Sequence, residues 1–282
     1  MFDFDDKRPF EVPLVILDTE TTGLQPWLGH RVVEIGAIRL ENDQVVDTFN
    51  VLLDPGRNMD PAASAVNGIQ DADLIGQPLF ADISHALLTF VDSALIIAHN
   101  AVFDADFLGM EFFIDSYTSP GPSVSLQNPW LCTLLLARNC FHFGRNNLGN
   151  IARLLGVRIG RAHRALNDVY TTYEVFKRMT AELKKQRIET IGDLLRAQGG
   201  AKYASFPGIT ELPMMVEQAL AEQQLLRIVY RNEKRETQRV ITPYYPTQHH
   251  GITYLIAHCH MSDEQRTFRI DRILDMELVP AF

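Results

Sequence analysis

Two acidic side chains, Asp18 and Glu20, stand one residue apart where the apolar run Val15–Leu17 ends. A β-branched apolar run predicts a strand, and alternate residues of a strand share one face, so both carboxylates point the same way. Like charges this close destabilise a fold unless a cation lies between them, and divalent metals are the usual partners of paired carboxylates. The spacing therefore indicates a metal site at a strand end. The alternative is a pair of solvated acids.

A second acidic block, His-Asn-Ala-Val-Phe-Asp, spans His99 to Asp104. It follows the short apolar run Ala94–Ala98, which predicts a buried strand, and it begins a helical pattern that continues to Phe113. Ligands of α/β sheets gather at strand ends, so this position suits a site. Alternatively, Asp104 serves only the helix, because carboxylates stabilise the first turn through the helix dipole.

A third block, His-Arg-Ala-Leu-Asn-Asp, spans His163 to Asp168 and precedes a long helical pattern that ends near Leu183. A histidine with an ordinary pKa near 6.5 can exchange a proton at neutral pH. The alternatives are a structural histidine and an N-cap role for Asp168.

Together the three blocks resemble the DEDDh exonucleases, a family with a ribonuclease-H-like fold that includes the proofreading subunits of replicative DNA polymerases. The family pattern D-x-E-T-T-G-L stands here at 18–24, H-N-A-x-F-D at 99–104, and H-x-A-x-x-D at 163–168. The resemblance covers residues 12–183 and every acidic position is present. It implies a 3′-to-5′ exonuclease that releases nucleoside 5′-monophosphates.

The resemblance also implies roles for individual residues. Two Mg²⁺ or Mn²⁺ ions about 4 Å apart would stabilise the attacking and leaving oxygens, because hard oxygen ligands suit these ions. His163 would accept the proton of the attacking water. The metal ligands would be Asp18, Glu20, Asp104 and Asp168. Contacts to the terminal nucleotide would come from Thr21, Gly23, Leu24, His99 and Phe103. A core aromatic role is the alternative for Phe103.

The surrounding pattern predicts an α/β fold, a mixed sheet flanked by helices, with a small β-rich C-terminal domain. Residues 12–53 read as three strands in a meander, and helices are predicted at Pro61–Asn67, Leu79–Val91, Thr133–Asn139 and Asn147–Leu155. We predict an exonuclease domain at 12–185, a linker at 186–213 that carries one short helix, and a second domain at 214–282.

The second domain resembles the WYL domain of bacterial regulators and defence proteins, which implies a nucleotide or nucleic-acid-end ligand. Thr253 replaces the signature tryptophan, in the sequence Gly-Ile-Thr-Tyr-Leu. A phosphate-binding face could be formed by Arg239, Arg266, Arg269 and Arg272. The alternative is a set of solvated or ion-paired arginines, because residues 221–282 carry eight basic and eight acidic residues.

Composition narrows the class of function. The formal net charge of −9 argues against a protein that binds a long duplex through many phosphate contacts. It is compatible with a protein that binds one end of a nucleic-acid chain at a metal site, because bound cations reverse the local charge. The first ten residues lack an apolar core, and no apolar run reaches membrane-spanning length, which predicts a cytoplasmic protein without membrane contact. The three cysteines form no CxxC pair, so neither a disulfide framework nor a cysteine zinc site is expected.

Three functions are consistent with these motifs and this composition. The first is a 3′-to-5′ exonuclease that acts on nucleic acid with a free 3′ end, DNA being favoured over RNA. The second is an exoribonuclease that trims RNA or short oligonucleotides with the same catalytic residues. The third is a regulatory ligand-binding protein in which the nuclease fold is a scaffold.

Overall fold

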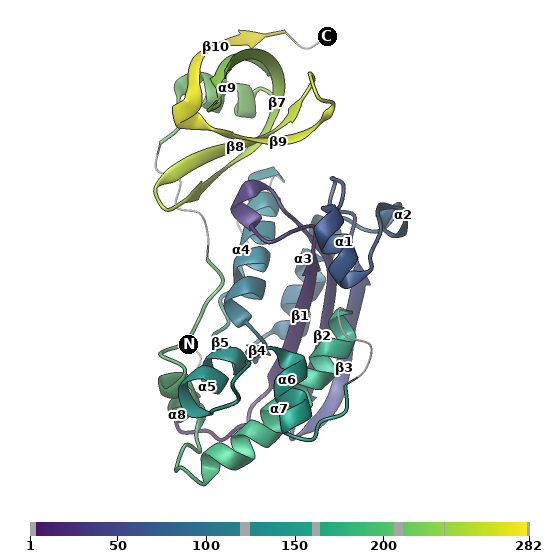
Figure 1. Ribbon diagram of the computed structural model, residues 1–282, viewed down its shortest axis with the longest axis vertical. Helices are drawn as coiled ribbons and strands as arrows, with labels where there is room; N and C mark the ends of the chain where they lie inside the picture. The colour runs from purple at the N-terminus through teal and green to yellow at the C-terminus, as the bar shows by residue number, and fades with distance from the viewer. Residues whose placement is uncertain (1–3, 119–124, 160–163, 206–210, 234, 281–282) are drawn as a thin grey trace. The chain divides into compact units, whose positions relative to one another are not determined.

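The computed structural model describes residues 4–118, 125–159, 164–205, 211–233 and 235–280. Within these ranges the chain forms two compact units. The first unit comprises Met1–Gly23, Arg31–Phe112 and Val124–Ser205, and the second comprises Leu24–His30, Phe113–Ser123 and Phe206–Phe282. Each unit contains a five-stranded sheet (Figure 1).

The first unit is a mixed sheet with strand order β3-β2-β1-β4-β5. Strands β1, β2 and β3 pair antiparallel, and β4 and β5 extend the sheet parallel to β1. Its strands are β1 (Leu14–Thr21), β2 (Val32–Glu41), β3 (Gln44–Leu52), β4 (Leu95–Ala98) and β5 (Trp130–Cys132). The predicted meander is confirmed; β5, only three residues long, was not predicted.

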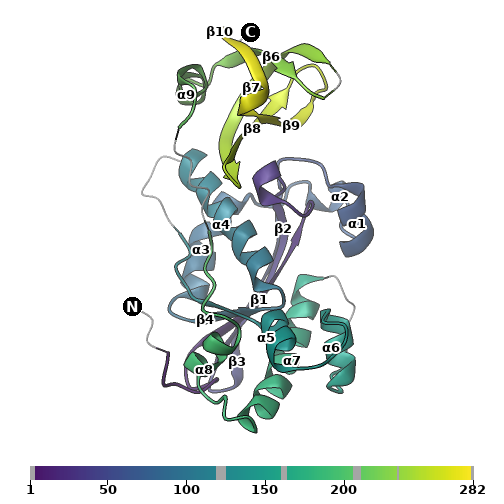
Figure 2. The same cartoon turned by 60° about the vertical axis from the view of Figure 1, so that its left-hand side comes forward.

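Helices cover both faces of this sheet (Figures 1 and 2). Helices α3 and α4 pack on one face, and α5 to α8 pack on the other. The helices of this region are α1 (Pro61–Asn67), α2 (Asp71–Leu74), α3 (Phe80–Val91), α4 (Ala101–Thr118), α5 (Thr133–Cys140), α6 (Leu148–Leu154), α7 (Ala165–Lys184) and α8 (Ile191–Ala197). The predicted α/β class with a helix-flanked mixed sheet is confirmed.

The alternation of β1 decides which helices meet which side chains. Val15 and Leu17 belong to the core under α3 and α4, whereas Leu14 and Ile16 belong to the core under α7. Because side chains alternate along a strand, Asp18 continues the α7 face.

Residues 186–205, which the sequence assigned to a linker, pack within the first unit. The side chain of Gln198 is buried, accepts a hydrogen bond from Cys132 N (2.6 Å) and donates to Trp130 O (3.0 Å). Ile191 and Leu194 of α8 are buried in the core that contains α7. An amide that satisfies a strand backbone is a tertiary interaction, and the local Gly-rich composition of 198–200 hides it.

The second unit is an antiparallel sheet with strand order β10-β6-β7-β8-β9, and α9 (Met214–Ala221) packs on its core. Its strands are β6 (Leu225–Arg231), β7 (Glu236–His249), β8 (Ile252–Cys259), β9 (Glu264–Arg269) and β10 (Ile273–Val279). The predicted β-rich C-terminal domain is confirmed. A 3-10 turn, η2 (Ile270–Arg272), joins β9 to β10.

The same unit contains the short segment Leu24–His30, with its 3-10 turn η1 (Pro26–Leu28). Thr247 Oγ1 donates to Trp27 O and Thr267 Oγ1 donates to Leu28 O, both at 2.7 Å. The Trp27 ring stacks on His249 with centroids 3.6 Å apart. These contacts satisfy backbone carbonyls of η1.

No helix in the described part of the chain is long and apolar enough to span a bilayer.

Candidate active site

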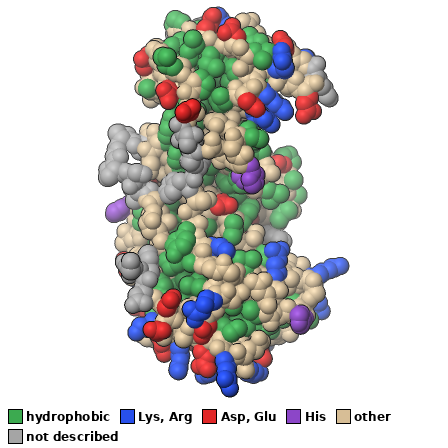
Figure 3. Space-filling model, turned by 90° about the vertical axis from the view of Figure 1, so that its left-hand side faces the viewer, with side chains coloured by type: hydrophobic (Ala, Val, Ile, Leu, Met, Phe, Trp, Pro, Cys, Tyr) green, Lys and Arg blue, Asp and Glu red, His purple; other side chains and the backbone are tan. Residues whose placement is uncertain are grey.

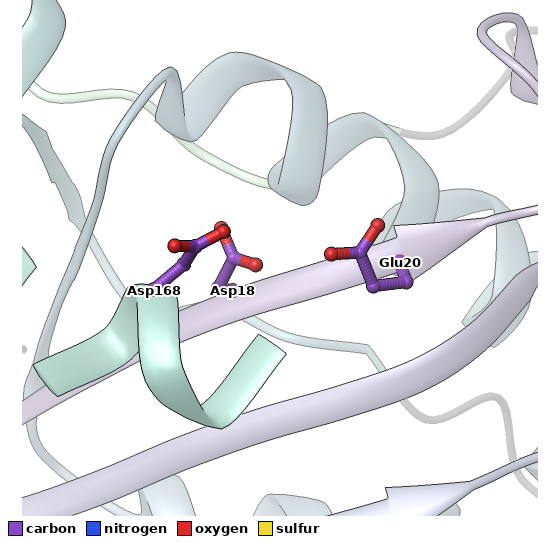
Figure 4. A group of neighbouring side chains, drawn as sticks. All are labelled: Asp18, Glu20 and Asp168. Carbon is purple, nitrogen blue, oxygen red and sulfur yellow. The ribbon is translucent and has the colours of Figure 1, made fainter. Parts of the chain in front are cut away.

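Three carboxylates meet on the α7 face of the first sheet. Oxygen atoms of Asp18, Glu20 and Asp168 all lie within 4.8 Å of one another, and all three residues are half-buried. Figure 4 shows the Asp18 and Asp168 side chains converging from β1 and α7, with Glu20 farther along β1. Three oxygen donors at this separation match the ligand set of a hard divalent cation.

Strand β2 explains why α7 brings Asp168 to this place. Gly36 lies opposite Asp18 in the β1–β2 ladder, and a Cβ atom on Gly36 would come within 2.5 Å of the backbone nitrogen of Leu166. Only glycine lets the first turn of α7 lie this close to the sheet.

An ion pair between a buried carboxylate and a partly exposed arginine fixes the beginning of α7. The Glu34 carboxylate, opposite Glu20 in the ladder, accepts hydrogen bonds from Arg164 Nη2 (2.9 Å) and Ala165 N (3.2 Å). Glu34 is 1% exposed. A buried carboxylate that receives a guanidinium and a helix-terminal amide is well compensated. The sequence reasoning missed Glu34, although a charged residue in the apolar run Val32–Ala37 was a signal.

Asp104 reaches the same strand from the first turn of α4. Its Oδ1 accepts hydrogen bonds from Thr19 N (3.0 Å) and Thr19 Oγ1 (2.8 Å), and the residue is 2% exposed. Thr19 faces α4 because it alternates with Asp18. These hydrogen bonds show that Asp104 does more than stabilise the first turn of α4. Asp104 is not one of the three carboxylates within 4.8 Å, but its charge, after burial, is the largest cause of the raised pKa of Asp18.

Burial and mutual repulsion make the carboxylates hard to ionise. Burial, then the neighbouring Asp168, raises the pKa of Glu20 from 4.5 to about 7. Burial raises the pKa of Asp104 to about 7, against the hydrogen bonds from Thr19 that lower it. Burial and then Asp104 raise the pKa of Asp18 well above its ordinary value. A bound divalent cation would reverse these shifts.

His99 is held as a neutral side chain. Its Nε2 lies 3.0 Å from the backbone oxygen of Asn146, which can only accept, so Nε2 carries the proton. Its Nδ1 lies 2.9 Å from Thr133 Oγ1. Burial lowers the pKa of His99 to about 4, so the ring is uncharged at neutral pH.

The remaining predicted residues lie in several environments. Thr21 is buried and donates through Oγ1 to Gly23 O (2.6 Å), whereas Leu24, in the second unit, is 78% exposed. Phe103 is half-buried and packs against Phe107, with ring centroids 4.7 Å apart. His163 lies outside the described residues. Asp168 lies in the first turn of α7, whose N-cap is Arg164, so the N-cap role suggested for Asp168 does not hold.

The four arginines predicted to bind a ligand in the second unit all have protein partners. Arg266 pairs with Glu264, Arg269 pairs with Asp271 at 2.6 Å, and Arg272 lies 4.0 Å from Glu233. Arg239 donates to Thr237 Oγ1 at 3.1 Å and lies 3.5 Å from Cys259 Sγ. The phosphate-binding face therefore stays a prediction.

Comparisons with known proteins agree with this geometry. Residues 15–176 match the model of the exonuclease family RNase_T, and residues 211–278 match the WYL domain. The chain is 32% identical over 194 residues to the DNA polymerase III subunit epsilon of Salmonella typhimurium, covering 66% of this chain and 79% of that protein. It is 29% identical over 201 residues to the PolC-type DNA polymerase III of Thermotoga maritima, covering 71% of this chain but only 14% of that protein.

Among solved structures, exonuclease X in complex with 5′ overhanging duplex DNA superposes with a TM-score of 0.51. The two sequences are 25% identical, and the match covers 66% of this chain and 99% of that one. This likeness and the mixed sheet confirm the ribonuclease-H-like fold class. The chain therefore belongs to the exonuclease family, and it carries a WYL domain after its exonuclease domain.

Proposed function

We propose that the protein is a metal-dependent 3′-to-5′ exonuclease that releases nucleoside 5′-monophosphates. The observation that carries this proposal is the convergence of Asp18, Glu20 and Asp168 within 4.8 Å, with Asp104 held against the same strand by Thr19. All four occupy the positions that the family motifs assign to acids.

The donor set favours Mg²⁺ or Mn²⁺ because all the converging groups are carboxylates. We propose two ions for each site, one for the attacking and one for the leaving oxygen, as the family resemblance implies. When bound, such ions offset the charge that a phosphodiester gains as it is attacked. Asp18, Glu20, Asp104 and Asp168 would hold the ions, and Thr19 fixes one oxygen of Asp104. His163 is the proposed base for the attacking water. The next residue, Arg164, is anchored by its ion pair with Glu34.

The proposed substrate is a free 3′ end, with DNA favoured over RNA. One relative that the chain matches over most of its length is the DNA polymerase III subunit epsilon of Salmonella typhimurium. The net charge of −9 favours binding of a chain end over binding of a long duplex through many phosphate contacts. On the face drawn in Figure 3, basic and acidic side chains are interspersed and do not form a broad basic patch.

Three further parts of the proposal concern the whole protein. We propose an exonuclease domain at 12–185, a linker at 186–213 and a WYL domain at 214–282. Because α8 packs in the core of the first unit, the exonuclease domain is better ended at Ser205, which shortens the linker. The WYL domain binds a nucleotide or a nucleic-acid end, with Arg239, Arg266, Arg269 and Arg272 as candidates. The protein works in the cytoplasm.

A substrate panel tests the activity. Single-stranded DNA, duplex DNA with a recessed 3′ end, and RNA are each incubated with the full chain and Mg²⁺ or Mn²⁺. We expect 5′-monophosphates from DNA, loss of activity in Asp18→Asn and His163→Ala, and wild-type activity in Asp47→Asn, which removes an exposed carboxylate on β3.

Faster digestion of RNA than of DNA would favour the trimming exoribonuclease. No digestion of any substrate, with nucleotide binding that persists in EDTA, would favour the regulatory ligand-binding protein. Wild-type digestion by Asp18→Asn would refute the assigned catalytic role.

A further inference from the structure

A hollow of about 490 Å³ in the first unit borders the acidic pair Asp18 and Asp168. Its volume lies within the range of roughly 300–1,000 Å³ that small-molecule and cofactor sites occupy. Besides the two acids, its lining includes His99, Leu134 and Arg138 of α5, Asn146, and Leu148 at the beginning of α6. The hollow is therefore continuous with the carboxylates, and it extends over α5 and the beginning of α6.

Arg138 is the basic residue of this lining. It stands in the last turn of α5 and is exposed, and among the described residues no hydrogen-bond or ion-pair partner is found for its guanidinium. By contrast, Arg31 and Arg164 pair with the buried carboxylates of Glu111 and Glu34. A guanidinium fork without a counter-ion, beside a site for phosphodiesters, has the geometry to pair with a phosphate.

Asn146 adds an unsatisfied polar group to the same lining. Its side-chain Oδ1 is buried and has no hydrogen-bond partner in the described part of the chain, whereas its backbone oxygen accepts from His99 Nε2. A buried acceptor without a donor is costly, so a ligand that brings an N–H or O–H group would be favoured there. A nucleotide offers both such a group and a phosphate.

We propose that this hollow holds the nucleotide on the leaving side of the scissile bond, and that Arg138 pairs with the 5′ phosphate of that nucleotide. This inference rests on the proposed exonuclease activity. Of the proposed contacts of the terminal nucleotide, Thr21 ends β1 and Gly23 follows it. His99 lines the hollow instead, and both of its ring nitrogens already pair with Thr133 and Asn146, so we assign it to the wall of the hollow. The hollow is bordered by Asp18 and Asp168 and not by Glu20, so it lies on the other side of the acidic group.

Two substrates separate this role from catalysis itself. A short single-stranded DNA oligonucleotide carries the leaving nucleotide and its phosphate, whereas thymidine 5′-(p-nitrophenyl phosphate) has p-nitrophenol in their place. Both are assayed with wild type, Arg138→Ala and Arg138→Lys. The matched control is Arg178→Ala on α7, an exposed arginine for which the described chain offers no partner, about 15 Å beyond Asp168 along the helix axis.

In Arg138→Ala we expect kcat/KM on the oligonucleotide to fall roughly tenfold to a hundredfold relative to kcat/KM on the ester, as for a lost hydrogen bond between charged groups. The slope of log KM for the oligonucleotide against log salt should fall by about 0.7, one phosphate contact. Arg138→Lys should recover part of both effects, and Arg178→Ala should change neither.

An equal loss on both substrates in Arg138→Ala, or no loss on the oligonucleotide, would overturn the assignment of Arg138. Neither outcome affects the proposed function, which stands if wild type cleaves both substrates. If wild type cleaves neither, the proposed function fails. Binding of the oligonucleotide in EDTA then tests whether the hollow holds a nucleotide. An unchanged dissociation constant in Arg138→Ala would refute the proposed role of Arg138 and of the hollow.

Discussion

Glu20 should destabilise the metal-free protein at alkaline pH, and Glu20→Gln should relieve that cost. The pKa of Glu20 is raised from 4.5 to about 7 by burial and by Asp168. A raised carboxyl pKa means that the folded state binds the proton more tightly than the unfolded state does. The free energy of unfolding therefore falls as the pH rises from 4.5 to 7 and is constant above that. At about 1.36 kcal/mol for each pH unit, the loss reaches about 3 kcal/mol at pH 8.

Glutamine has nearly the same shape and no charge, so the variant escapes this loss. Denaturation of both proteins in EDTA should give Glu20→Gln the higher stability at pH 8, by up to about 3 kcal/mol, or roughly 6–12 °C in Tm for a unit of this size. At pH 5 the difference should be below about 1 kcal/mol.

Saturating Mg²⁺ should reverse the order at pH 8, because wild type gains more from the cation than the variant does. Asp47→Asn, the exposed control, should show neither effect. A stability difference that is the same at pH 5 and pH 8, or a variant less stable than wild type in EDTA at pH 8, would refute the electrostatic account of this site.

Three other predictions concern the parts that position the site. Gly36→Ala should cost about 2 kcal/mol or more in chemical denaturation and abolish nuclease activity, because its Cβ would displace the beginning of α7. Glu34→Gln should lower kcat more than it raises KM and should cost roughly 1–3 kcal/mol, since it removes the charge that receives the arginine before α7. A chain ending at Lys185 should be less soluble and less stable than one ending at Ser205, because it loses the buried hydrogen bonds of Gln198, and thermal melting compares the two.

The sequence predicted the strand end and the helix starts that carry the acids because their signals are local, whereas the meeting of these acids in one site followed from the family resemblance. Asp18 and Glu20 lie at a strand end and share a face, and the alternation of a strand is readable in the order of residues. The first turns that carry Asp104 and Asp168 were likewise predicted from helical periodicity. Apolar patterns of this length distinguish a helix from a strand.

The residues whose roles the sequence did not reveal contact residues that are distant in the sequence. Glu34 bonds to Arg164 across 130 residues, and its role is invisible until β2 and α7 are packed together. The same holds for Gln198, whose partner Cys132 lies on β5, a strand too short to show a pattern. The turn η2 was missed because β9 and β10 follow one another without a Gly or Pro to mark the change.

The placement of Asp168 depends on the sheet more than on its own helix. The N-cap residue of α7, Arg164, makes no capping hydrogen bond with its side chain, and the orphan amide of Ala165 is satisfied by Glu34 of β2 instead. Gly36, two residues further along the same strand, provides the space into which that first turn fits. Because β2 pairs in register with β1, one strand sets the distance between the helix and Asp18. The carboxylates therefore converge through the β1–β2 ladder, so a change in β2 should disturb the acidic site even though no residue of β2 belongs to it.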